Sequence, residues 1–484
     1  MKQHEEKNNK EEHLYSALKE YAASDYYPYH MPGHKRRLCG AMPEHVMEMD
    51  ITEIEDFDNL HQPEGVLRRL QERAASLYGA EESFYLVNGS TGGILSAISA
   101  ALPVGGHLLM ARNCHKSVYH AVYLRNLTVS YLYPKRMEEY DIDDAITPQQ
   151  IEEALKREPD INAVLVVSPT YEGRIAEIEH IAEIVHRRNI PLIVDEAHGA
   201  HLGMSEEVSR NSCQAGADLV IHSVHKTLPA MTQTALLHVN GNRVDRDKLR
   251  RFLHIYQTSS PSYVLMASID NALTLMEEQG RELLAGFCSR YEAMVRELSQ
   301  CKCLEFLAPE KGRQDIGKLI ISGKKFGLSG QRLYDILLKE YHMQSEMAEG
   351  SYCLAMFTVG DDEEAYERMT VGLLDIDKRM ASGRIEADMT SQEIPSLLTD
   401  CPVRSLSLST AWDMPWEKVK PEEAVGRVVG EFINLYPPGI PLLVPGELIT
   451  EEVCRQIVSY LNLELNVQGV EEVDGDRQIK VLRK

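Results

Sequence analysis

Positive charge is scarce in this sequence. Its 484 residues include 51 Lys and Arg against 74 Asp and Glu, which gives a formal net charge of −23. A chain with so few cations has no basic surface to cover phosphates, which excludes a nucleic-acid-binding protein and disfavours anionic membranes. Long apolar runs are absent as well, so the sequence predicts no membrane-spanning helix.

The nine cysteines form no metal or disulfide pattern. Their number is odd, no Cys-x-x-Cys occurs, and Cys301 and Cys303 are too close together for the usual zinc spacing. His198 and His201 have the spacing of a metal-binding pair, but no third ligand follows at a sensible distance. We therefore expect no metal. We expect a cytoplasmic protein, because the charged N-terminus has no features of a signal peptide.

From about residue 60 the sequence alternates between amphipathic helical stretches and short apolar runs. Thr147 followed by Pro148 is typical of an N-cap and a first helical position. Helical periodicity covers residues 64–78, 92–102, 147–157 and 175–188. Seven runs have the length of buried strands: 83–87, 107–110, 129–133, 163–167, 192–194, 219–222 and 235–239. The alternation predicts an α/β fold with a largely parallel seven-stranded sheet, covered on both faces by helices.

The chain divides into three predicted regions. Residues 1–60 form an N-terminal arm, in which 26–35 cannot be helical because two prolines and a glycine interrupt it. Residues 61–300 form a large domain that holds the predicted sheet. Residues 301–484 form a smaller C-terminal α+β region, where strands and helices mix and prolines become frequent.

Two ionisable residues stand at the ends of predicted strands. Asp195 closes the apolar run 192–194, and Lys226 follows the run 219–222, 31 residues further along. That separation accommodates one helix and a return strand of a βαβ unit. An amine and a carboxylate placed in this way can hold pyridoxal phosphate (PLP). The alternatives are a solvated lysine and an Asp that caps the next helix.

The chemistry of PLP matches these two side chains. The Lys226 amine would form the Schiff base with the cofactor aldehyde. Asp195 would pair with the protonated pyridine nitrogen, which lets the ring accept an electron pair from the substrate. Ala197, two residues further, is small enough for the ring to lie flat against the backbone.

A glycine-rich turn precedes these residues. Residues 88–93 read Asn-Gly-Ser-Thr-Gly-Gly, between a predicted strand and a predicted helix. Backbone amides around Gly92, the hydroxyls of Ser90 and Thr91, and the helix dipole would bind a phosphate dianion. Such turns are often only structural, and no Gly-Lys-Ser/Thr follows, which excludes a nucleotide P-loop. Without a P-loop, the letters Asp-Glu-Ala-His at 195–198 do not indicate a helicase.

Four more side chains are candidates for the same site. His115 follows a predicted strand, where its ring would cover one face of the cofactor, although a lone histidine is more often a surface or core residue. Ser223 and His225 flank Lys226, and both can bind phosphate. His198, three residues after Asp195, is a candidate for cofactor binding and catalysis.

These residues resemble the PLP-lysine signature of the prokaryotic ornithine/lysine/arginine decarboxylases, which have the aspartate-aminotransferase fold (fold type I). The resemblance covers Ser223-Val224-His225-Lys226 and continues to Met231-Thr232-Gln233-Thr234. Blocks that are similar to the family lie along most of the chain, at 29–35, 50–53, 58–65, 88–92, 168–173, 195–201, 436–441 and 445–447. The agreement of so many separate blocks makes the resemblance specific.

The resemblance implies a PLP-dependent decarboxylase. Such an enzyme converts a basic L-amino acid (arginine, lysine or ornithine) to CO2 and a polyamine-type amine, as in polyamine biosynthesis. The expected catalytic residues are Lys226, Asp195, His115 and His198. The substrate amine displaces Lys226 from the cofactor, the carboxylate departs as CO2, and a proton returns to Cα from Lys226 or a neighbouring histidine.

The resemblance also implies a homodimer with shared active sites, or a higher homo-oligomer. Ser259 would then approach the phosphate in the partner subunit, and Glu447 would meet the distal cation of the substrate. The alternatives are a helix-start turn at Ser259 and a helix cap at Glu447. Pro229 departs from the signature, which has a small residue there. The chain has no room for the N-terminal wing domain of the larger members, so it resembles the shorter subclass.

Two other functions fit the same residues less well. Another fold-type-I activity, such as an aminotransferase, needs an Arg to hold the substrate carboxylate, and nothing around Arg404 singles it out. A PLP-binding protein without activity is disfavoured because Lys226, Asp195 and His115 are all present. The sequence does not indicate which of the three basic amino acids is the substrate.

Overall fold

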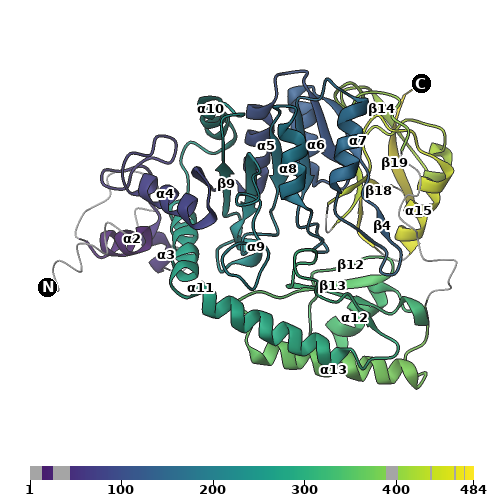
Figure 1. The fold of residues 1–484 in the computed structure, drawn as a ribbon. Coiled ribbons are helices and arrows are strands. Elements are labelled where there is room, and N and C mark those ends of the chain that lie inside the picture. The colour runs from purple at the N-terminus through teal and green to yellow at the C-terminus, as the bar shows by residue number, and fades with distance from the viewer. Residues whose placement is uncertain are drawn as a thin grey trace. The chain divides into compact units, whose positions relative to one another are not determined.

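The computed structural model describes residues 13–24, 44–388, 402–436, 439–462, 465–473 and 475–483 (Figure 1). The chain forms two compact units, each made of several segments. The first comprises Met1–Pro103, Asn162–Ser168 and Glu177–Ala285, and the second comprises Val104–Ile161, Pro169–Ala176 and Gly286–Lys484. The three predicted regions stay a prediction, and the block at 29–35 lies outside the described residues.

The first unit contains five strands with helices between them. Its strands are β1 (Glu82–Leu86), β6 (Ala163–Val167), β7 (Leu192–Asp195), β8 (Leu219–Ser223) and β9 (Ala235–Val239). Its helices are α2 (Leu14–Ala22), α3 (Glu44–Met49), α4 (Val66–Tyr78), α5 (Gly89–Ala101), α8 (Ile178–His186), α9 (Val224–Thr227) and α10 (Arg246–Tyr256). Helix α11 (Tyr263–Leu298) begins in this unit and ends in the second.

The strands form the predicted sheet. The seven-stranded sheet has the order β1-β9-β8-β7-β6-β2-β3, with β2 (His107–Ala111) and β3 (Thr128–Leu132). Strands β6, β7 and β8 run parallel, and β9 is antiparallel to both β1 and β8. Every residue of β8 and β9 is buried, and both strands are mostly apolar, with His222, Ser223 and His238 as buried polar exceptions.

The second unit carries the remaining elements. Besides β2 and β3, its strands are β4 (Arg136–Met137), β5 (Ile142–Asp143), β10 (Glu305–Phe306), β11 (Lys318–Ser322), β12 (Met347–Ala348), β13 (Tyr352–Met356), β14 (Trp416–Val419), β15 (Ile433–Leu435), β16 (Pro441–Leu443), β17 (Val467–Gln468), β18 (Val470–Val473) and β19 (Asp476–Leu482). Its helices are α6 (Lys116–Arg125), α7 (Pro148–Arg157), η1 (Lys324–Phe326), α12 (Gly330–Glu340), α13 (Glu363–Ala381), α14 (Leu408–Trp412), η2 (Pro421–Ala424) and α15 (Glu451–Asn462).

Local chemistry fixes where helices begin and how closely they pack. Helix α7 has the predicted cap: Gln150 N donates to Thr147 Oγ1 at 3.4 Å, and Thr147 N donates to Gln150 Oε1 at 3.0 Å. At Gly93 in α5, a Cβ atom would lie 2.6 Å from Leu86 Cδ1 and 3.1 Å from Ile221 Cγ2. The missing side chain therefore lets α5 lie directly against β1 and β8.

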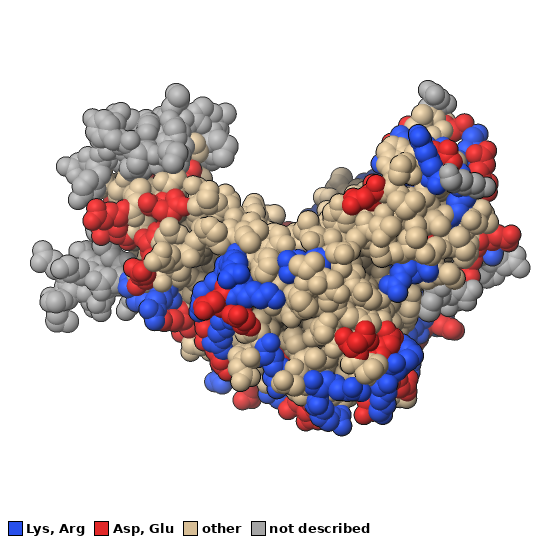
Figure 2. Space-filling model, turned by 90° about the horizontal axis from the view of Figure 1, so that it is seen from above, with Lys and Arg blue, Asp and Glu red and all other residues tan. Residues whose placement is uncertain are grey.

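Charged side chains are mixed on the surface shown in Figure 2. On that face Lys and Arg lie among Asp and Glu, and no continuous basic patch forms there. No helix in the described part of the chain combines the length and the apolarity needed to cross a membrane. Among the same residues, no three His, Cys, Asp or Glu side chains are grouped so as to hold a metal ion.

Candidate active site

Lys226 lies in α9, a single helical turn that follows β8 directly. Its Nζ is 3.0 Å from Nε2 of His198, and the His198 side chain is buried. An amine and an imidazole at this distance can exchange a proton, provided that one of them is neutral. His198, one of the predicted catalytic residues, is therefore in contact with Lys226.

Asp195 is the last residue of β7 and is 4% exposed. Its Oδ1 accepts a hydrogen bond from Ala197 N at 3.2 Å, and it forms no ion pair within the described residues. Burial raises the pKa of Asp195, and the nearby charge of Lys226 opposes that rise. A buried carboxylate in this state is stabilised by a cationic group on a ligand.

Two buried hydroxyls close to Lys226 have no hydrogen-bond partner among the described residues. They are Ser223 Oγ, in the final residue of β8, and Thr227 Oγ1, in α9. An unpartnered buried hydroxyl is destabilising, so both indicate a ligand with acceptor atoms. His225 Nδ1 is 2.9 Å from the Thr234 carbonyl, which it can only approach as a donor. Its Nε2 is then the acceptor nitrogen of the neutral ring.

The glycine-rich turn forms the first turn of α5. Ser90 is half-buried and Thr91 is exposed. Gly89 has a φ of 67°, and its N donates to the Gln233 carbonyl at 3.0 Å, which joins the turn to the segment that follows Lys226. The first-turn amides of a thirteen-residue helix lack partners within the helix and can bind an anion.

Most of the predicted site residues belong to one unit. The first unit contains Ser90, Thr91, Gly92, Asp195, Ala197, His198, Ser223, His225, Lys226 and Ser259. Ser259 is exposed, between α10 and α11. His115 and Glu447 belong to the second unit, so a role for either one beside Lys226 stays a prediction. Ser117 N donates to His115 Nδ1 at 3.2 Å, so His115 is the N-cap of α6.

Glu447 has a partner that the sequence did not indicate. Its Oε2 accepts from Arg112 Nη2 at 3.0 Å and from Val444 N at 2.8 Å, and the residue is 2% exposed. Arg112 also donates to the Pro441 carbonyl at 2.7 Å and to the Leu442 carbonyl at 3.2 Å. The available signal was an Arg placed directly after a fully buried strand, β2. The predicted contact of Glu447 with a substrate cation stays a prediction.

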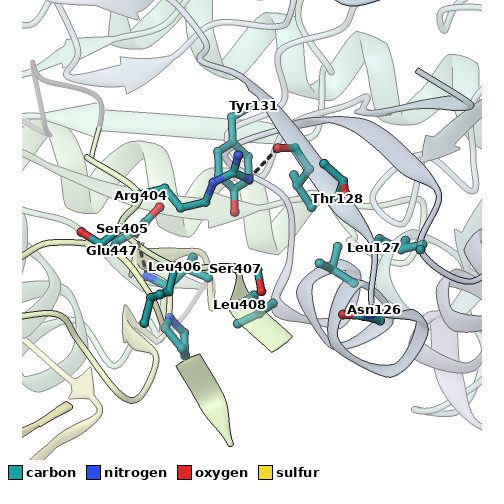
Figure 3. A pocket seen from close by; sticks show the side chains of 15 residues that line it. Asn126, Leu127, Thr128, Tyr131, Arg404, Ser405, Leu406, Ser407, Leu408 and Glu447 are labelled. Carbon is teal, nitrogen blue, oxygen red and sulfur yellow. Dashed lines mark hydrogen bonds between the residues drawn. The ribbon is translucent and has the colours of Figure 1, made fainter. Parts of the chain in front are cut away.

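A cavity of about 430 Å³ lies next to this ion pair in the second unit (Figure 3). Its lining includes Glu447, Tyr131 and Arg404. Figure 3 shows Arg404 extended towards β3, where Nη1 donates to the Val129 carbonyl at 2.7 Å. The guanidinium therefore already has a backbone partner, and no observation gives Arg404 the carboxylate-holding role of an aminotransferase.

Two family models match most of the chain. The family model described as "Orn/Lys/Arg decarboxylase, major domain" matches residues 12–316, and "Orn/Lys/Arg decarboxylase, C-terminal domain" matches residues 408–475. An arginine decarboxylase of Bacillus subtilis is 33% identical and aligns over 95% of each chain. The inducible lysine decarboxylase of Escherichia coli is 23% identical over 97% of this chain and 81% of its own.

Solved structures confirm the predicted fold. The lysine decarboxylase LdcF of Francisella novicida has a TM-score of 0.85 at 19% identity, and the alignment covers 98% of this chain and 81% of that one. The constitutive lysine decarboxylase of Escherichia coli has a TM-score of 0.80 at 19% identity, over 97% and 82%. At these identities the likeness establishes fold type I and its smaller C-terminal region.

Proposed function

This chain belongs to the Orn/Lys/Arg decarboxylase family, and from that premise we propose that it decarboxylates a basic L-amino acid with PLP as cofactor. One observation carries the proposal, the position of the Lys226 amine. Its Nζ lies 3.0 Å from His198 Nε2, and Lys226 is close enough to the buried Asp195 for the charges of Lys226 and Asp195 to interact. An amine can form the Schiff base with PLP, an enclosed carboxylate can pair with its pyridine nitrogen, and a proton acceptor beside the amine can serve proton transfer.

The donors and charges of the first unit fit PLP. Asp195 would face the pyridine nitrogen and keep it protonated, because a buried carboxylate is stabilised by a cation. The unpartnered hydroxyls of Ser223 and Thr227 would donate to acceptor atoms of the cofactor. Ser90, Thr91 and the first-turn amides of α5 would receive the phosphate. Ala197 presents no side-chain bulk beyond a methyl group to the ring.

Each residue has a distinct role in the reaction. When bound, PLP supplies the electron sink for the pair left at Cα as CO2 departs. Lys226 would hold the cofactor through a covalent bond to Nζ and would release it to the substrate amine. His198 would hold or release a proton at Lys226 Nζ, and the proton that returns to Cα would come from Lys226 or a neighbouring histidine. His115 would cover the exposed face of the cofactor.

Arginine is the substrate that we propose to test first. Three arginine decarboxylases are 30–33% identical to this chain and align over about 95% of it. Two lysine decarboxylases are only 23% identical. The product would then be the amine that arginine forms when it loses its carboxylate, and amines of this class are precursors of polyamines. We also propose a cytoplasmic homodimer in which Ser259 approaches the partner's phosphate, which light scattering tests through the molar mass in solution.

The experiment compares wild type with Lys226→Ala. Wild type should show visible cofactor absorbance and release CO2 from arginine in preference to lysine and ornithine at matched concentrations. Lys226→Ala should lose the absorbance and at least about 10³-fold in kcat, because the covalent attachment is removed. Lys156→Ala, a solvated lysine on α7, is the matched control and should behave as wild type.

Other outcomes separate the alternatives. Full activity in Lys226→Ala would refute the assignment. Amino-group transfer to a keto acid without CO2 release would favour an aminotransferase. Cofactor absorbance without turnover of any of the three amino acids would favour an inactive PLP-binding protein.

A further inference from the structure

Four buried side chains form a continuous hydrogen-bonded chain across the sheet of the first unit. Glu196 Oε2 lies 2.7 Å from His222 Nε2, and His222 Nδ1 lies 3.0 Å from His238 Nε2. His238 Nδ1 lies 2.6 Å from Ser83 Oγ. None of the four residues is more than 4% exposed. The reaction proposed above uses none of them.

The hydrogen bonds that link Glu196, His222, His238 and Ser83 can all form in either of two donor directions. Burial lowers the pKa of His222 to about 3 and that of His238 well below its ordinary value, so both rings are neutral, with one donor and one acceptor each. With Glu196 ionised, every donor points towards its carboxylate, starting from the Ser83 hydroxyl. With Glu196 protonated, every donor points towards Ser83. In both cases no buried nitrogen or oxygen along the chain lacks a partner.

The four hydrogen-bonded side chains share strands with the candidate active site, but they lie on the opposite face of the sheet. Asp195 and Ile221 are register partners in β7 and β8, and Glu196 N donates to the Ile221 carbonyl at 3.0 Å. Successive side chains of a strand point to opposite faces, so Glu196 and His222 point away from Asp195. On that face the Tyr78 ring lies 4.7 Å from the centroids of both histidines.

Glu196 also holds the segment that follows it. Its carboxylate accepts from Ser212 N at 3.0 Å and from Ser212 Oγ at 2.7 Å. Glu196 therefore links the side chains of Ser83, His222 and His238, on β1, β8 and β9, to the end of β7 and to Ser212. Backbone register between β7 and β8 involves only three residue pairs, so the side-chain links add to a short strand contact.

We propose that Glu196, His222, His238 and Ser83 are positioning residues that hold the ends of β7 and β8 at the spacing required for Asp195 and Lys226 to engage one cofactor. The proposal rests on the proposed function. Asp195 immediately precedes Glu196, and Lys226 lies four residues after His222. A shift of either strand end would therefore move a cofactor-binding group, and displacements of this kind cost on the order of 10²-fold in rate.

The test uses His222→Leu, with His186→Leu as matched control. His186 Nε2 lies 2.7 Å from Asp218 Oδ2, so it also pairs with a buried carboxylate, but Asp218 precedes β8 at its opposite end. We expect His222→Leu to bind PLP about tenfold more weakly or worse, to change the visible circular dichroism of the bound cofactor, and to lower kcat up to 10²-fold. His186→Leu should lower thermal stability while leaving PLP affinity and spectrum unchanged.

Glu196 supplies the second pair of variants. Glu196→Gln can still accept from Ser212 and donate to His222, which fixes the chain in one direction, so it should retain PLP affinity to within a few-fold. Glu196→Leu breaks both links and should reproduce the defect of His222→Leu. If His222→Leu does not fold, Ser83→Ala is the milder variant and should give a smaller change in the same direction.

The outcomes distinguish this proposal from the proposed function. Variants that lose thermal stability but bind PLP with wild-type affinity and spectrum would overturn the positioning role. The four hydrogen-bonded residues would then only stabilise the core. Wild-type protein that develops no cofactor absorbance on addition of PLP would overturn the proposed function itself. Equal defects in Glu196→Gln and Glu196→Leu would contradict the role of the hydrogen bonds.

Discussion

Lys226 and Glu447 were both singled out as charged residues, and their surroundings differ. Lys226 contacts the imidazole ring of His198 and lies close to Asp195. Asp195 has no ion-pair partner within the described residues. Glu447 is enclosed with Arg112 and accepts a backbone hydrogen bond as well. A satisfied buried ion pair contributes specificity and order, whereas a buried carboxylate without an ion pair, such as Asp195, favours ligand binding and chemistry.

The ion pair between Arg112 and Glu447 yields a prediction at the residue scale. Arg112→Met removes the cation and leaves Glu447 buried without its charged partner, which should destabilise the protein by about 3–5 kcal/mol. The double variant Arg112→Met/Glu447→Gln removes the stranded charge and should recover part of that loss. Urea unfolding monitored by circular dichroism measures both. A double variant no more stable than Arg112→Met would contradict the electrostatic explanation.

Helix α12 illustrates how an element is fixed by close backbone contact. It begins at Gly330, after Ser329, whose Oγ accepts from Arg332 N at 3.0 Å. A Cβ atom on Gly330 would lie 2.1 Å from the carbonyl oxygens of both Glu349 and Tyr352. The start of α12 therefore lies against the turn that precedes β13, at a distance that only glycine permits.

This contact predicts opposite effects for the same substitution at two glycines. Gly330→Ala should destabilise the protein by about 1–3 kcal/mol, because backbone atoms must move to admit the methyl group. Gly286→Ala lies within α11, where a Cβ atom would meet only the end of the Arg290 side chain and no backbone atom, and it should stabilise the helix by about 0.5–1 kcal/mol. Thermal unfolding of both variants measures the difference. Equal shifts of the two midpoints would contradict the packing argument.

At the scale of the whole molecule, buried carboxyl groups link stability to pH. Burial raises the pKa of Glu349 to about 8, with Arg136 opposing the rise, and it raises the pKa of Glu196 to about 8. Burial also raises the pKa of Asp143 to about 7, although its side chain is 25% exposed and water weakens its contribution. Glu349 Oε1 has no hydrogen-bond partner among the described residues.

The sign of the pH dependence follows from these shifts. An acid whose pKa is raised by folding keeps a proton that the unfolded chain releases, so stability falls as pH rises towards the folded pKa. Burial of His222 acts in the opposite direction, but only below its ordinary value of 6.5. Between about pH 6.5 and 8 the carboxyl groups therefore dominate, and each contributes a loss of up to about 1.4 kcal/mol per pH unit.

The prediction is a falling thermal midpoint between pH 6.5 and 8, and a flatter curve for Glu349→Gln. The amide of that variant cannot ionise, so its share of the loss disappears. Glu364→Gln, on the exposed surface of α13, is the matched control and should retain the wild-type slope. Calorimetry at closely spaced pH values measures the slopes. Identical slopes for all three proteins would show that Glu349 does not titrate in this range.

Local sequence signals determined much of the architecture. The alternation of apolar runs and helical stretches predicted all seven strands of the sheet, because strands in a sheet covered by helices are mostly buried and therefore mostly apolar. The Thr147-Pro148 start of α7 follows from capping chemistry alone. Asp195 and Lys226 were recognisable because polar residues at strand ends stand out against the apolar runs before them. The one-turn helix around Lys226 was not, since four residues carry no periodicity.

Only the tertiary structure decided which polar groups are paired. Arg112 and Glu447 are 335 residues apart, and Ser83 and His238 are 155 apart, so no local pattern relates them. Whether a carboxylate is free to bind a ligand or already neutralised depends on which distant segment packs against it, and burial sets the strength of that pairing. The sequence by itself determined the strands and the residues at their ends, whereas packing determined their partners, because charges interact through space and not along the chain.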